Sequence, residues 1–101
     1  MSIPHTVVVI LEAKQGKEQE LELALEAVVE PSSSEEACLE YRLHKSVDNP
    51  AQFVLYENWA SKEEHQAQFD KPYIKDLGAK LGELLASPYQ AVFAQKIISN
   101  A

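Results

Sequence analysis

The chain has 101 residues, of which 46% are hydrophobic and 25% are charged, and its formal net charge is −7. This length and composition suit one hydrophobic core, so we expect a single domain over residues 1–101. The negative charge repels phosphate backbones and anionic membrane surfaces, which argues against nucleic acid and membranes as partners. Cys38 is the only cysteine, which excludes an intrachain disulfide and a multi-cysteine metal site. Because we find no signal-peptide pattern and no apolar run approaching roughly 18 residues, we expect a cytoplasmic protein.

The first half of the chain predicts a strand, a helix and a second strand. Residues Thr6–Leu11 form a β-branched apolar run that is typical of a strand. From Lys17 to Glu30 the apolar residues recur at helical spacing, which predicts an amphipathic helix that ends at Pro31. Residues Cys38–Lys45 alternate between apolar and polar side chains, as in a second strand. We expect its apolar face to carry Leu39, Tyr41 and Leu43.

The second half predicts a hairpin partner, a broken helical region and a last strand. Residues Gln52–Trp59 resume an extended pattern after a turn sequence, so they form the third predicted strand. Ser61–Glu64 matches a capping box, which predicts a short helix directly after Trp59. A second helical segment begins at Pro72 and ends near Ser87–Pro88. The fourth predicted strand covers Gln90–Ile98.

The resulting order, β-α-β-β-α-β, is that of an α+β ferredoxin-like sandwich, in which helices cover only one face of the sheet. The first strand nevertheless carries apolar residues on both faces, with Val7, Val9 and Leu11 opposite Val8 and Ile10. An uncovered apolar face of this size calls for a partner, and a second copy of the chain is the simplest one. We therefore expect a homodimer.

The segment that follows the third strand is the best candidate for a site. Glu57 and Trp59 share one strand face, and the helix that begins at Ser61 must fold back over it. That helical region carries His65, Gln68 and Tyr73, where a pure core would use aliphatic side chains. Convergent polar groups in an apolar cleft indicate a small-molecule pocket. The alternative is that Trp59 is a core aromatic and the polar groups find backbone partners.

Two stretches carry a family resemblance, residues 31–44 (PSSSEEACLEYRLH) and residues 53–72, which contain FVLYENW. They resemble the antibiotic biosynthesis monooxygenase (ABM) family, whose members typically have an S-R-x-E-x-G-C-x-x-Y segment and a strand ending in E-x-W. Tyr41, Glu57 and Trp59 match these patterns. Two helix histidines of the family fall on Gln68 and Tyr73, whereas His65 lies three residues before the first of them.

The resemblance implies a dimeric α+β barrel and a cofactor-independent monooxygenase that acts on a quinol-like or polyphenolic small molecule with O₂. No metal and no organic cofactor is implied, because the deprotonated substrate supplies its own electrons to O₂. The protein then positions the substrate and stabilises its anion. The catalytic residues implied are His65, as a base, and Trp59, as a pocket wall. The substrate-binding residues implied are Glu57, Gln68, Tyr73 and Tyr41.

Two other functions remain open at this point. Related dimeric barrels catalyse proton transfers, so an isomerase-type enzyme for a small keto-sugar or lactone is one alternative. The other is a non-catalytic small-molecule-binding or stress-response barrel protein, which the absence of the two helix histidines favours.

Overall fold

The computed structural model describes residues 4–98, and within them it confirms the α+β ferredoxin-like order. The strands are β1 (His5–Glu12), β2 (Cys38–Lys45), β3 (Gln52–Trp59) and β4 (Gln90–Ala94). The helices are α1 (Glu18–Ser33), α2 (Lys62–Ala67) and α3 (Pro72–Leu84), with a 3₁₀ turn η1 (Gln68–Asp70) between the last two. Between residues 4 and 98, no helix combines the length and the hydropathy that a membrane crossing requires.

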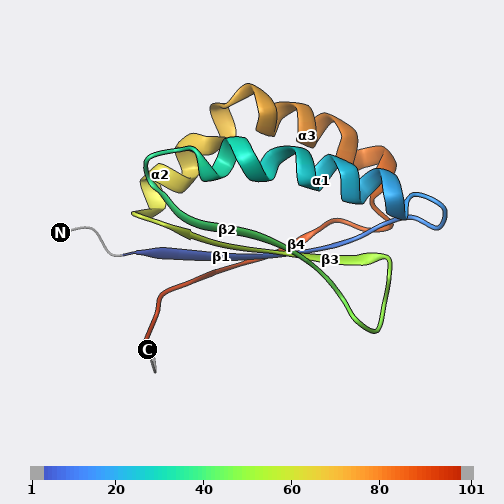
Figure 1. The fold of residues 1–101 in the computed structure, drawn as a ribbon, viewed down its shortest axis with the longest axis horizontal. Helices are drawn as coiled ribbons and strands as arrows, with labels where there is room; N and C mark the ends of the chain where they lie inside the picture. Colours follow the sequence, from blue (N-terminus) through green and yellow to red (C-terminus); the bar gives the residue numbers. More distant parts are fainter. Residues whose placement is uncertain (1–3, 99–101) are drawn as a thin grey trace.

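The strands form an antiparallel sheet in the order β2-β3-β1-β4, and Figure 1 shows the helices together on one of its faces. Period-two alternation turns every second residue of β1 and β3 toward the helices. The core lies in this layer. Its members with the largest buried side chains are Val7, Leu21, Leu25, Phe53 and Trp59.

Helix α1 does not end at Pro31, so that prediction is wrong. Proline in a last turn removes only one backbone donor, and the helix continues to Ser33. The backbone N–H of Ser34 still donates to the carbonyl of Glu30, and the Ser34 hydroxyl donates to the same oxygen over 2.9 Å. These two bonds close the helix three residues beyond the proline.

Two details of the predicted strands are also corrected. Strand β4 ends at Ala94 rather than at Ile98: Ala94 pairs with Thr6, which is next to the first residue of the neighbouring strand β1, His5. In β2 the register shifts between Cys38 and Glu40, and Leu39 is 60% exposed instead of lying on the apolar face. A bulge of this kind places one extra residue outside the ladder.

The face of the sheet opposite the helices has no element packed against it within residues 4–98 (Figure 1). Val8, Ile10 and Tyr56 are only half-buried there, and Val92 is 53% exposed. We call this surface the open face.

A chain of polar side chains crosses the open face. Thr6 donates to the side-chain oxygen of Asn58, Asn58 donates to Glu40 over 2.8 Å, and Arg42 donates to the other oxygen of Glu40. The chain therefore links strands β1, β3 and β2 across an otherwise apolar surface.

Candidate active-site cavity

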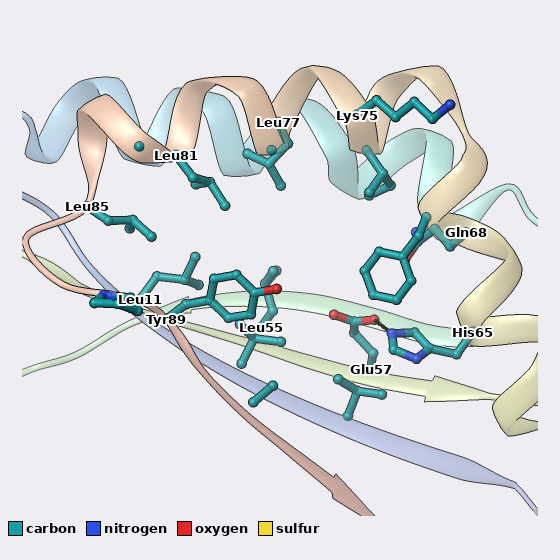
Figure 2. Close-up of a pocket in the computed structure, with 18 of the residues that line it drawn as sticks. Leu11, Leu55, Glu57, His65, Gln68, Lys75, Leu77, Leu81, Leu85 and Tyr89 are labelled. Carbon is teal, nitrogen blue, oxygen red and sulfur yellow. Dashed lines mark ion pairs between the residues drawn. The ribbon is translucent and has the colours of Figure 1, made fainter.

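A cavity of about 700 Å³ lies between α3 and the helix-covered face of the sheet (Figure 2). Its sheet side is formed mainly by aliphatic residues of β1 and β3, and its helix side by the apolar stripe of α3. Gly78 and Gly82 also line it, and a Cβ added to either would meet no atom within 4 Å. The two glycines, one helical turn apart, therefore leave room where side chains would otherwise fill the space. Tyr89 and Phe93 close the side next to β4.

One carboxyl group interrupts this apolar lining. Alternation in β3 turns Glu57 toward the helices, and the register places it beside Val7 and Tyr41. The side chain of Glu57 is 4% exposed. The indole Nε1–H of Trp59 donates to Glu57 Oε1 over 2.9 Å, and Nε2 of His65 lies 3.8 Å from the same oxygen. Figure 2 shows the carboxyl group on the sheet side of the cavity, with its second oxygen directed into the open space.

Burial shifts the pKa values of Glu57 and His65 in opposite directions. It raises the pKa of Glu57 to about 7, although the Trp59 hydrogen bond partly offsets this shift by stabilising the anion. It lowers the pKa of His65 to about 4, with a further contribution from His5. At neutral pH the imidazole is therefore uncharged and Glu57 is divided between its two forms. The contact between them is a polar contact rather than an ion pair.

Aromatic rings surround His65. Its ring centroid lies 5.3 Å from those of His5 and Phe69, 5.6 Å from that of Trp59 and 5.7 Å from that of Phe93. These rings replace water around the imidazole, which explains both its burial and its lowered pKa. They also hold Nε2 in its position beside the carboxyl group.

A second polar group links the end of α1 to the α2–α3 region. The Gln68 side-chain amide donates to the buried hydroxyl of Ser32 over 2.8 Å and to the Tyr73 hydroxyl over 3.4 Å. Tyr73 in turn donates to a carboxylate oxygen of Glu35 over 3.1 Å. Lys71 completes the group through a 3.4 Å ion pair with Glu35. Gln68 thus lines the cavity with its amide N–H groups already engaged.

The structure brings only part of the predicted site to the cavity wall, namely Tyr41, Glu57, His65 and Gln68. Trp59 and Tyr73 do not line the cavity. The Trp59 ring is 1% exposed and belongs to the core, so it supports Glu57 instead of forming the expected wall. Burial raises the pKa of Tyr41, as does the charge of Glu57, so this phenol stays protonated at neutral pH.

Sequence reasoning missed the contribution of α3 and of the segment before β4. The spacing of Gly78 and Gly82 within an apolar helical stripe was the available signal, since glycine is costly inside a helix. Tyr89 offered no comparable signal. Within residues 4–98, no three His, Cys, Asp or Glu side chains are grouped so that they could hold a metal ion.

The sequence model of the family described as antibiotic biosynthesis monooxygenase matches residues 4–80. The chain belongs to the ABM family. Rv0793 of Mycobacterium tuberculosis, a proposed monooxygenase by name, is 29% identical over 91 residues, which cover 87% of this chain and 86% of that protein. An uncharacterised protein of Synechocystis, sll1783, is 27% identical over 85 residues, which cover 84% of this chain but only 58% of that relative.

Solved structures of similar proteins share the fold across the whole domain. PA3566 from Pseudomonas aeruginosa superposes with a TM-score of 0.92 at 24% identity, covering 97% of this chain and 98% of that one. Rv0793 superposes with a TM-score of 0.90 at 23% identity, covering 97% and 99%. At these identities the structural likeness establishes the fold, and the site depends on the residues of this chain.

Proposed function

We propose that this ABM-family protein is a cofactor-independent monooxygenase that oxidises a quinol-like or polyphenolic small molecule. The observation that carries the proposal is a largely apolar cavity with a buried Glu57–His65 pair on its wall. Its volume of about 700 Å³ falls within the ~300–1,000 Å³ typical of small-molecule sites. An aromatic ring fits between the leucines of α3 and the aliphatic sheet, where a ring hydroxyl can reach Glu57 or His65.

The chemistry that such a cavity supports begins with loss of the hydroxyl proton. The resulting phenolate is electron-rich and reduces O₂ directly, so that a quinol and O₂ give a hydroxyquinone and one water molecule. The contributions proposed for the protein are positioning of the ring, acceptance of the proton and exclusion of bulk water. The base belongs to the Glu57–His65 pair, and Tyr41, which lies opposite Glu57 in the sheet register, places a neutral phenol on the same cavity wall.

We also propose that the protein works as a homodimer in which two open faces pack together as a dimeric α+β barrel. The half-buried apolar residues of the open face support this assembly, because a monomer would leave them in water. Light scattering should return twice the chain mass. A monomer mass at micromolar concentration would contradict the assembly without bearing on the cavity.

An isomerase is the second candidate, and Glu57 is the observation that favours it. A carboxylate with a pKa near neutrality is suited to removing a proton next to a carbonyl group, which requires no O₂. The two functions differ in their dependence on oxygen. Conversion of a substrate under strict anaerobiosis would favour the isomerase, whereas binding without conversion would favour a non-catalytic binding protein.

The proposed oxygenase is tested by O₂ consumption with a panel of benzoquinols, naphthoquinols and larger polyphenols, corrected for autoxidation. We expect at least one quinol to show consumption that saturates with substrate. Gly78→Leu should abolish most of it by filling the cavity. Ala79→Leu is the matched control, since it adds the same side chain to the next, exposed position of α3 and should leave the rate unchanged. Equal rates in wild type, Gly78→Leu and buffer would refute the proposal.

A further inference from the structure

The geometry points to Glu57 as the group that accepts the substrate proton, with His65 as a positioning residue that stays uncharged. This inference rests on the proposed function, because it assigns the base for the same cavity. It reverses the role that the family resemblance implies for His65.

The first argument is access. Glu57 Oε1 accepts from Trp59 and faces His65, whereas Oε2 makes no hydrogen bond to any residue between 4 and 98. Every fully buried side-chain nitrogen or oxygen in this range has a partner, so Oε2 is not fully buried, and neither are the imidazole nitrogens of His65, which make no hydrogen bond; the orientation of the carboxyl group is what distinguishes the two residues. The orientation in Figure 2 agrees, since one carboxyl oxygen meets His65 and the other is directed into the open space.

The second argument is the placement of the imidazole. His65 directs Nε2 at the carboxyl oxygen, and four aromatic rings pack around its own ring. A substrate hydroxyl that approached Nε2 would have to displace Glu57 from that contact. At 3.8 Å the imidazole is too far from Oε1 for a hydrogen bond, so it restricts the carboxyl group by packing beside it, whereas the Trp59 indole holds the same oxygen by a hydrogen bond.

The third argument is charge balance in a water-poor site. In the proposed step the substrate O–H bond breaks, the proton forms a bond to Oε2, and the electron pair stays on the substrate oxygen. One negative charge moves from Glu57 to the substrate, so the number of charges in the cavity does not change. Transfer to His65 would instead create an imidazolium and a phenolate where both partners had been neutral. New charges are costly in an apolar site.

The pKa values of Glu57 and His65 also favour Glu57 as the base. The pKa of Glu57, raised by burial to about 7, makes it a far better proton acceptor than His65, whose pKa burial lowers to about 4. The pKa values of Tyr41 and Cys38 are raised, so both of these acids keep their protons. The ionisable groups that face Glu57 from neighbouring elements or line the same cavity are Cys38, Tyr41, His65, Lys75 and Tyr89.

The kinetic test compares Glu57→Gln with His65→Gln, using the quinol that wild type oxidises fastest. For wild type we expect kcat/KM to rise with pH through about 7 as Glu57 ionises. Glu57→Gln should lower kcat by about 10²–10⁴-fold with KM nearly unchanged, which is the usual contribution of a general base. It should also remove the dependence on pH, and Glu57→Asp should restore part of the rate. His65→Gln should keep the pH-dependent rise while losing about 10-fold or less in kcat.

A second measurement needs no turnover and therefore remains valid if the proposed function fails. 4-Nitrophenol, a phenol that ionises near neutral pH, is bound at mildly alkaline pH and followed by difference infrared spectroscopy. A protonated-carboxyl band should appear on binding to wild type and to His65→Gln and should be absent from Glu57→Gln. Imidazolium signals in place of that band would overturn the inference, as would Glu57→Gln keeping its rate within about threefold. Absence of O₂ consumption with every quinol would refute only the oxygenase.

Discussion

The two faces of the sheet carry similar aliphatic residues but differ in what lies against them. Val7 and Leu11 of β1 are buried under the helices, whereas Val8 and Ile10 of the same strand lie half-buried on the open face. On the covered side the packing is incomplete, and the remaining space forms the cavity. A strand whose side chains alternate between two faces can therefore line a ligand site on one face and present a surface for association on the other.

Two glutamates, one on each face of the sheet, differ in their pKa for the same reason. Glu57, on the covered face, has few polar neighbours, and burial raises its pKa to about 7. Glu40, on the open face, accepts from Arg42 and Asn58, and these bonds lower its pKa. The first carboxyl group is able to exchange a proton near neutral pH, and the second remains an anion within a polar chain. Environment, not residue type, decides which glutamate is fit for acid–base chemistry.

The largest effect is expected from placing a charge on β1, an inner strand of the sheet, on the open face. In the proposed dimer Ile10→Lys buries an unpaired ammonium group, which costs several kcal/mol and weakens association by roughly 10²-fold or more. Light scattering across a dilution series should show a monomer. Leu23→Lys is the matched control, since Leu23 is 58% exposed on α1, and this variant should stay dimeric. A dimeric Ile10→Lys protein would show that association uses another surface.

A smaller effect, confined to the covered face, is that the stability of two variants should change with pH in opposite directions relative to wild type. Glu57 has a raised pKa in the folded state, so its contribution to stability is complete below 4.5 and is lost as pH rises toward about 7. His65 has a lowered pKa, so its contribution is complete above 6.5 and is lost as pH falls toward about 4. In wild type the two contributions to the free energy of unfolding therefore change with pH in opposite directions.

Removing one group at a time should reveal how the contribution of each group to stability depends on pH. The free energy of unfolding of Glu57→Gln, minus that of wild type, should rise between pH 4.5 and about 7. The same difference for His65→Gln should fall between about pH 4 and 6.5. Each change reaches at most about 3.5 kcal/mol, because each pKa shift spans about 2.5 pH units at 1.4 kcal/mol per unit. Urea denaturation at a series of pH values measures both, and parallel curves would show that neither group titrates abnormally in the folded protein.

Periodicity predicted the fold well because each rule concerned neighbours in sequence. The alternation of β3 placed Glu57 and Trp59 on one face, and the Ser61 hydroxyl accepts the N–H of Glu64 over 3.2 Å, as the capping pattern requires. The site was predicted less completely. Whether the Trp59 ring lines a cavity or supports Glu57 depends on the rotamer of Trp59 and on the distance between the helix layer and the sheet. The spacing of residues along the sequence indicates neither of these. The end of β4 depended likewise on where its partner strand begins.

The smallest predicted effect concerns the hydrogen bond that joins α1 to η1 beside the cavity. Ser32 is fully buried and accepts from the Gln68 amide, so Ser32→Ala leaves that N–H with one partner fewer. We expect a loss of about 1–3 kcal/mol in the free energy of unfolding, measured by urea denaturation. Ser33→Ala makes the same change at the adjacent, exposed position and should stay within about 0.5 kcal/mol of wild type. Because alanine favours a helix more than serine does, helix propensity cannot cause a loss in either variant, and equal losses would mean that the bond to Gln68 does not account for the change. A selective loss would show that the covered face is held together partly by the polar groups at the edge of its cavity, a role that the polar chain on the open face does not have for the helices.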